Sequence, residues 1–207
     1  MRMNADNVFK RATDVIGAGL GLMFFSPVLI GIAVWVKLDS PGPVFFRQTR
    51  LGKGGKPFAL LKFRTMYTHS TEILNGHLEA NPDARLTWMQ FQKLMDDPRL
   101  TRAGKGLRRL SLDELPQLWN VLRGEMSLVG PRPCLPEQRD FYGDGFACYA
   151  AVRPGLTGLW QVSGRNRLSF AERVALDVKY VREWSWGLDV KILAQTVGVV
   201  LRRDGAF

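Results

Sequence analysis

Residues 15–36 read VIGAGLGLMFFSPVLIGIAVWV and contain no charged side chain. As one continuous α-helix this stretch would be about 33 Å long, enough to cross the hydrocarbon core of a bilayer, which is about 30 Å thick. A secretory signal is a poorer interpretation, because the run is long for such a segment and Lys37-Leu38-Asp39 follows it without a small-residue cleavage pattern. A buried helix of a soluble protein is an alternative, although residues 20–32 are apolar or small on every side except at Ser26.

Two features of this stretch favour a helix that enters the membrane and returns over one that crosses it. Ser26-Pro27 lies in the middle, where proline removes a backbone hydrogen bond and clashes with the preceding turn at a cost of about 3 kcal/mol. Each half is then about 16 Å long, the depth of one leaflet. Basic residues flank both ends, and the positive-inside rule places both flanks on the cytoplasmic side. We therefore expect a re-entrant helix over residues 1–40 that breaks at Ser26-Pro27, where the Ser26 hydroxyl binds carbonyls freed by the break. A proline-kinked span stays open as the alternative.

The rest of the chain combines strand patterns with helical ones. The expected elements are two strands at 44–51 and 57–63 around a Gly-Lys turn, and helices at 68–94, 169–184 and 188–200. Asn81-Pro82 interrupts the first of these helices, and the capping box Ser169-x-x-Glu172 opens the second. These patterns predict an α+β fold that is mostly helical, with a small β-hairpin. The re-entrant segment would occupy residues 1–40, and residues 41–207 would form a cytosolic catalytic domain at the membrane surface.

Composition narrows the choice of partners. The chain has 207 residues, a net charge of +10 and a pI near 10.1, so an anionic partner is expected. Nucleic acid, anionic lipid and phosphorylated small molecules all fit that description. Cys134 and Cys148 are not in a C-x-x-C arrangement, which is typical of reduced thiols in a cytosolic protein.

Two adjacent carboxylates, Asp113 and Glu114, stand at the start of a short predicted helix, and Pro131-Arg132-Pro133 follows about one helix and one turn later. A carboxylate pair that faces a rigidly held guanidinium is suited to a metal-bound phosphate or pyrophosphate. A helix N-terminus also lowers the pKa of a carboxylate, which would leave Asp113 ionised and able to attack phosphorus. The alternative is structural, because Ser111-x-x-Glu114 is also the pattern of a capping box. Local sequence leaves both interpretations open.

Three further segments carry candidate groups. Lys62 and Arg64 alternate with Phe63 at the end of a predicted strand, so both cations share one face, although a solvated strand face fits equally well. Residues 153–165 are rich in turn residues and hydrogen-bonding groups and predict a loop that lines a site. Residues 99–109 contain five basic residues and no acid, which fits lipid head groups, substrate or a solvated face.

Five ordered motifs together resemble the bacterial sugar transferases, also called the monotopic phosphoglycosyl transferases. The motifs are Lys62-Phe63-Arg64-Thr65-Met66, residues 111–116, residues 127–133, residues 154–165 and residues 200–206. The resemblance covers nearly the whole chain and is greatest to the catalytic region of undecaprenyl-phosphate galactose phosphotransferases. Longer relatives of that kind carry an extra region before the matched part, so we expect either a short natural form or a truncation.

The resemblance implies transfer of a sugar 1-phosphate from a UDP-sugar to undecaprenyl phosphate, with release of UMP and with Mg²⁺ as cofactor. It implies that Asp113 is the nucleophile, which forms a covalent aspartyl phosphosugar, that Glu114 is the metal ligand, and that the membrane break is Ser26-Pro27. The other residues that it assigns are catalytic Lys62, Arg132 and Asp177, and substrate-binding Arg64, Pro133, Gln161 and Arg165. For Asp177 a surface ion pair with Arg173, four residues earlier, is the ordinary alternative.

The same resemblance implies a monotopic protein of the bacterial inner membrane, with its catalytic domain on the cytoplasmic face and no nucleic-acid partner. The reaction would be the first membrane step of O-antigen, capsule or exopolysaccharide assembly. Galactose is the favoured sugar and glucose the next, and a homo-oligomer is left open. Two other functions also stay open: a conventional UDP-sugar glycosyltransferase that releases UDP, and a basic module that binds a membrane surface without catalysis.

Overall fold

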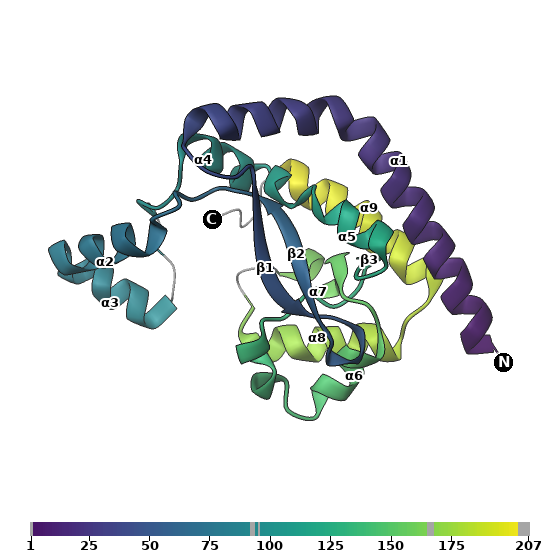
Figure 1. Cartoon of the computed structure of the whole chain (residues 1–207). Coiled ribbons are helices and arrows are strands. Elements are labelled where there is room, and N and C mark those ends of the chain that lie inside the picture. Colours follow the sequence, from purple (N-terminus) through teal and green to yellow (C-terminus); the bar gives the residue numbers. More distant parts are fainter. Residues whose placement is uncertain (1, 92–93, 95, 165–167, 203–207) are drawn as a thin grey trace.

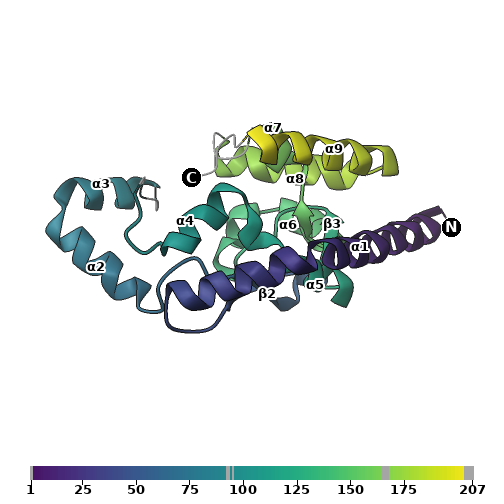
Figure 2. The ribbon, with the colours of Figure 1, turned by 90° about the horizontal axis from the view of Figure 1, so that it is seen from above.

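The structure, a computed structural model, describes residues 2–91, 94, 96–164 and 168–202. It has the predicted α+β class: it is mostly helical, with small sheets and a long N-terminal helix that lies across the rest of the molecule (Figure 1). The helices are α1 (Arg2–Asp39), α2 (Ser70–Ala80), α3 (Pro82–Phe91), α4 (Arg102–Arg109), α5 (Gln117–Arg123), α6 (Gly145–Ala151), α7 (Leu159–Ser163), α8 (Phe170–Arg182) and α9 (Trp186–Arg202). Figure 2 shows α8 and α9 as a layer on one side, α1 on the other, and the α2–α3 pair projecting at one end.

Helix α1 passes through Ser26-Pro27 as a single helix and is bent along its length (Figure 1). Pro27 has no N–H to offer the carbonyl of Met23, four residues earlier. The Ser26 hydroxyl donates to that carbonyl instead, at 2.8 Å. The predicted role of this hydroxyl is therefore confirmed. Ser26-Pro27 lies within one continuous helix, and re-entry at this point stays a prediction.

One face of α1 packs on the body and the other is exposed. Ala18 joins a core with Leu118 of α5, while Ile32 and Val36 join another with Phe63. The helix is long and apolar enough to cross a membrane. Its exposed large apolar side chains are Val8, Phe9, Val15, Ile16, Leu20, Met23, Phe24, Val28, Ile30, Val34, Trp35 and Leu38. This exposed apolar face is consistent with a membrane helix that stays in contact with the catalytic body.

The predicted hairpin is present. Strand β1 (Phe45–Leu51) pairs antiparallel with β2 (Pro57–Phe63), and Phe45 stands opposite Phe63. The Gly-Lys segment between the strands forms a short 3₁₀ turn at Lys53–Gly55, in which Gly54 has a positive φ of 70°. That conformation suits glycine, so the interpretation of this segment as a turn is confirmed.

A second, parallel pair was not predicted. Strand β3 (Ser127–Val129) pairs with β4 (Gly155–Thr157), which the sequence had indicated as loop. The backbones of the two segments approach closely: a Cβ on Gly155 would lie 2.1 Å from the backbone nitrogen of Gly130. Three-residue strands give too short a pattern for sequence periodicity to detect.

The predicted helix boundaries are close to those observed. Pro82 is the first residue of α3, as an N1 proline should be. The Ser169 hydroxyl accepts from the Glu172 amide at 3.3 Å, and Glu172 Oε2 accepts from the Ser169 amide at 2.7 Å. The capping box at the start of α8 is therefore confirmed.

Candidate active site

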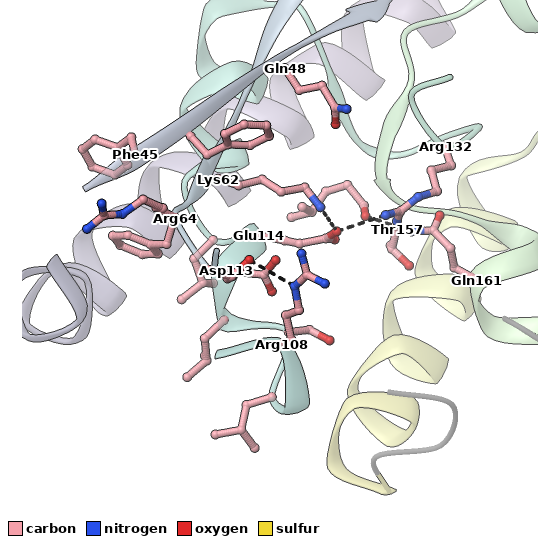
Figure 3. Close-up of a pocket in the computed structure, with 18 of the residues that line it drawn as sticks. Phe45, Gln48, Lys62, Arg64, Arg108, Asp113, Glu114, Arg132, Thr157 and Gln161 are labelled. Carbon is pink, nitrogen blue, oxygen red and sulfur yellow. Dashed lines mark hydrogen bonds and ion pairs between the residues drawn. The ribbon is translucent and has the colours of Figure 1, made fainter. Parts of the chain in front are cut away.

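A cavity of about 1110 Å³ lies between the β1–β2 hairpin, α4, the turn at Leu112–Glu114, and helices α7 to α9 (Figure 3). Aromatic and aliphatic side chains form much of its wall, including Phe25, two residues before Pro27 of α1. The polar groups converge from separate elements. They include Lys62, Arg108, Asp113, Glu114, Arg132 and Gln161.

The turn that carries the two carboxylates is not a capping box. Ser111 has a left-handed backbone, with φ 55° and ψ 21°, and its side chain caps no amide. An N-cap residue needs an extended backbone, so this conformation removes the predicted reciprocal bonds. Leu112–Glu114 forms a 3₁₀ turn just before α5 and directs both carboxylates toward the cavity.

Glu114 is held by two cations. Lys62 Nζ donates to Glu114 Oε1 at 2.6 Å, and Arg132 Nη2 donates to the same oxygen at 3.1 Å. Burial by itself raises the pKa of Glu114, but the charges and hydrogen bonds of Arg132 and Lys62 outweigh it and lower the pKa to about 2. Glu114 is therefore a carboxylate at neutral pH, and the structure brings Lys62, Glu114 and Arg132 together.

Asp113 is in a different electrostatic situation. Its residue is only 7% exposed, and burial raises the pKa of its carboxyl. Lys62 and Arg108 act in the opposite direction, and the neighbouring charge of Glu114 adds to the rise. The sequence predicted that a helix N-terminus lowers the pKa of Asp113. The pKa is instead raised, because desolvation is the largest effect. A poorly solvated carboxylate beside cations has the character of a nucleophile.

Arg108 is the main residue that sequence reasoning did not single out. It lines the cavity near Asp113, and its Nε donates to Thr65 Oγ1 at 3.0 Å. Gly104, one turn earlier, allows α4 to approach the hairpin, since a Cβ there would lie 1.9 Å from the Thr65 carbonyl oxygen. In the sequence, Arg108 is marked only by its place in the basic segment of residues 99–109, four residues after the glycine that permits this close approach.

Two predicted substrate-binding residues have other contacts. The Arg64 guanidinium donates to the carbonyls of Val36, Ser40 and Pro41, at the C-terminal end of α1. Cations at such an end satisfy free carbonyls and favour the helix dipole. Pro133 is buried, and its carbonyl accepts from Arg50 Nη1 at 3.0 Å. Arg64 touches the cavity wall, whereas Pro133 does not line this cavity.

Asp177 lies behind the cavity rather than in its wall. It is 1% exposed, and its Oδ2 accepts from the Tyr142 hydroxyl at 2.9 Å. Burial raises its pKa to about 7, against the Tyr142 hydrogen bond and the backbone amide and charge of Arg132. These contacts make Asp177 a support for the Arg132 loop. The alternative ion pair is not formed, because Arg173 donates to the Leu168 carbonyl at 3.1 Å and stacks on Trp160.

Gln161 lines the cavity from α7, and Arg165 lies outside the described residues. The Gln161 amide nitrogen donates to the Leu156 carbonyl at 3.2 Å. Its Oε1 is buried without a hydrogen-bond partner among residues 2–91, 94, 96–164 and 168–202.

The carboxylate pair also fits a magnesium ion. Within the described part of the chain no group of three or more His, Cys, Asp or Glu residues could hold a metal. Magnesium does not need one, because it is usually held by one or two carboxylates together with substrate phosphates and water. Asp113 and Glu114 are such a pair, and both hydrogen bonds to Glu114 end on Oε1.

Comparison with known proteins identifies relatives among bacterial sugar transferases. A family model described as "Bacterial sugar transferase" matches residues 5–203. The exopolysaccharide production protein ExoY of Rhizobium meliloti is 46% identical over 96% of this chain and 88% of its own length. Undecaprenyl-phosphate galactose phosphotransferase of Salmonella typhimurium is 45% identical over 96% of this chain. UDP-glucose:undecaprenyl-phosphate glucose-1-phosphate transferase of Caulobacter vibrioides is 45% identical, over 96% of this chain and 72% of its own length.

The relatives differ in length. The chain spans 41% of the Salmonella protein and 43% of an uncharacterized sugar transferase of Haemophilus influenzae, which is 46% identical. The resemblance carried by the five sequence motifs is confirmed by the family match. Because that match extends over nearly the whole sequence, this chain belongs to the bacterial sugar transferase family.

Proposed function

We propose that this protein is a phosphoglycosyl transferase that moves a sugar 1-phosphate from a UDP-sugar to undecaprenyl phosphate and releases UMP. The observation that carries the proposal is Asp113, a buried carboxylate beside Glu114, with Lys62 and Arg108 among the charges that act on it. The printed names of the Salmonella and Caulobacter relatives describe transferases of this kind, one for galactose and one for glucose. Galactose remains the favoured sugar and glucose the next.

The first step is attack of an Asp113 carboxylate oxygen on the phosphorus that bears the sugar. A bond forms between that oxygen and phosphorus, and the bond from phosphorus to the bridging oxygen breaks. UMP leaves with the electron pair on its phosphate oxygen, so no proton is needed. The product on the protein is an aspartyl phosphosugar.

In the second step, a phosphate oxygen of undecaprenyl phosphate attacks the same phosphorus. The acyl phosphate bond breaks and its electron pair returns to Asp113 as a carboxylate. The lipid leaves as a diphosphate that carries the sugar. Each step exchanges one oxygen on phosphorus for another, so Asp113 is the nucleophile of the first step and the leaving group of the second.

The cations around the turn have separate tasks. Arg132 presents a forked guanidinium that suits phosphate oxygens, and it is already oriented by Glu114. Lys62 contacts Glu114, and its charge opposes the rise that burial causes in the pKa of Asp113, so it favours the ionised nucleophile. Arg108 does the same from α4. Together they stabilise the charge that develops on the transferred phosphoryl group.

Magnesium would be held by Glu114, with Asp113 beside it. When bound, it supplies Lewis-acid stabilisation of the pyrophosphate oxygens. The chain's own contribution is to keep Glu114 ionised, through the two cations that lower its pKa to about 2.

The lipid acceptor requires a site at a membrane. Phe25 of α1 belongs to the wall of the same cavity, which supports a route by which a lipid phosphate at the membrane surface would reach the carboxylate pair. We propose that α1 re-enters the cytoplasmic leaflet of the bacterial inner membrane at Ser26-Pro27. Single cysteines placed before residue 12 and after residue 40 should label from the same side. Labelling from opposite sides would reject re-entry.

The proposed chemistry is tested by intact-mass analysis. Treatment with a UDP-sugar in the absence of acceptor should add one phosphohexose to the wild-type chain. Asp113→Asn should form no adduct and transfer no sugar, whereas Asp83→Asn, at an exposed position of α3, should behave as wild type. Release of UDP in place of UMP would indicate a conventional glycosyltransferase. Unchanged transfer by Asp113→Asn would reject the mechanism.

A further inference from the structure

We propose that Gln161 and Thr157 bind the uracil base of the donor and select it against cytosine. The inference rests on the proposed function and names the group that one wall of the same cavity recognises. It is carried by the hydrogen-bonding character of that wall, which offers acceptors at both residues.

The Gln161 amide has only one orientation that its contacts allow. Its nitrogen faces the Leu156 carbonyl at 3.2 Å, and a carbonyl can only accept, so Nε2 must be on that side. Oε1 is then turned away, is buried, and has no hydrogen-bond partner in the described part of the chain. Gly158 leaves the space beside this oxygen free of a side chain, because a Cβ there would lie 3.0 Å from it. A buried acceptor in a cavity wall without a donor is a site for a ligand N–H or O–H.

Thr157 presents an acceptor as well. Its Oγ1 is 2.7 Å from Thr196 Oγ1, and Thr196 Oγ1 donates to the Ile192 carbonyl at 2.8 Å. Each hydroxyl has one proton, so Thr196 must accept from Thr157. With both protons used inside the protein, the two hydroxyls have only lone pairs left. Gln161 Oε1 and Thr157 Oγ1 are therefore both acceptors, and the second Nε2 proton of Gln161 is the one donor that these two side chains keep.

The direction of the reaction places the nucleotide at this wall. In-line attack by Asp113 expels UMP on the side of phosphorus away from Asp113, while the hexose stays with the attacked phosphorus. Arg132 connects the carboxylate pair with α7. It contacts Glu114, and its guanidinium carbon lies 5.9 Å from the centre of the Trp160 ring. Gln161 follows Trp160 in α7 and lies beyond Arg132 from Asp113 in Figure 3.

The chemistry of the wall matches uracil. Uracil carries a donor, N3–H, between two carbonyls, whereas cytosine has a lone pair at N3. An acceptor wall binds the first and repels the second. Arg173 stacks on Trp160 at 4.8 Å and lines the same cavity, so it offers N–H donors to the uracil carbonyls and a flat surface for the base.

The test compares UMP and CMP as inhibitors of sugar-phosphate transfer by the full chain. Neither carries a hexose, so the comparison reports on the base alone. For the wild type we expect UMP to inhibit about 10- to 100-fold more strongly than CMP. Gln161→Leu should reduce this ratio to about 3 or less. The matched control is Gln48→Leu, a glutamine of the same cavity whose Oε1 already accepts from Arg50 at 2.7 Å, and it should keep the wild-type ratio.

Other outcomes overturn the inference. A wild-type ratio near one would do so, and so would an unchanged ratio in Gln161→Leu together with a raised KM for UDP-sugars, which would assign the wall to the hexose. If Gln161→Leu does not fold, Thr157→Val tests the same wall and should lower the ratio several-fold. Release of UDP by the wild type would overturn the proposed function as well. An unchanged ratio with UMP as product would overturn this inference alone.

Discussion

The chain contains the pattern Ser-x-x-Glu twice, and the two copies form different structures. At Ser169 and Glu172 the pattern is a capping box, with reciprocal bonds between each side chain and the other's amide. At Ser111 and Glu114 the same pattern forms a 3₁₀ turn that starts from a left-handed residue, and neither side chain caps. Sequence rules identify both copies as capping boxes, but only the copy at Ser169 and Glu172 forms one.

The difference lies in what the glutamate finds outside its own turn. Glu172 is exposed, and its pKa is lowered by hydrogen bonds from the Ser169 hydroxyl and amide. Glu114 meets Lys62 and Arg132, which arrive from β2 and from the loop after β3. A cation offers a carboxylate Coulomb attraction in addition to a hydrogen bond, so the two cations outcompete a backbone amide. A local pattern predicts a cap only where no tertiary partner is stronger.

The largest expected difference between the copies is in catalysis. Glu114→Gln should lower kcat by about 10²- to 10³-fold, because it removes the charge that holds Arg132 and Lys62 and that, in the proposed mechanism, would also hold a metal ion. Glu172→Gln should change kcat less than about twofold. Steady-state transfer assays on the two purified variants measure the contrast.

The two copies would be functionally equivalent if both variants lost activity to the same extent. In that case Glu114 would act through helix stability and not through the site. Thermal unfolding of both variants separates these explanations, since Glu114→Gln should stay folded at the assay temperature.

The next largest effect concerns α8, the helix that the second copy opens. Its Asp177 is buried without the cation contacts of Glu114, and its pKa is about 7 instead of the ordinary 3.8. The folded state then holds a proton that the unfolded state releases, so stability falls as pH rises from about 4 to about 7. Asp177→Asn resembles the protonated form and should remove this loss, on the order of 2–4 kcal/mol at pH 8.

Unfolding temperatures at pH 5 and pH 8 provide the measurement. Asp177→Asn should unfold at a higher temperature than the wild type at pH 8, and the difference should be less than half as large at pH 5. A variant that is less stable at both values would show that the ionised carboxylate stabilises the Arg132 loop.

Local signals predicted the elements whose contacts are local. Strand alternation found β2 and placed Lys62 correctly, and the second Ser-x-x-Glu pattern found the start of α8. Sequence did not predict that Arg64 would bind the end of α1, because that contact depends on chain segments more than twenty residues away. Arg108 was not singled out for the same reason: its position depends on how closely α4 approaches Thr65.

A smaller effect is expected at the serine that does cap. Ser169→Ala removes the oxygen that accepts from the Glu172 amide, and loss of such a cap costs about 1 kcal/mol. Ser111→Ala should cost clearly less, since Ser111 caps nothing. Equilibrium or thermal unfolding of the two alanine variants gives the comparison. Equal losses would mean that the cap at α8 does not contribute to stability.

The smallest effect has the opposite sign. Ser111 has a φ of 55°, a conformation that glycine adopts without the Cβ clash of other residues. Ser111→Gly should therefore stabilise the fold by about 0.5 kcal/mol, the relief of strain being partly offset by the greater entropy of glycine in the unfolded chain. Ser169→Gly has no strain to relieve and should lower stability by a few tenths of a kcal/mol. Opposite shifts in unfolding temperature would confirm that the two copies differ in backbone as well as in partners. Destabilisation by Ser111→Gly would instead show that its hydroxyl has a role in the site.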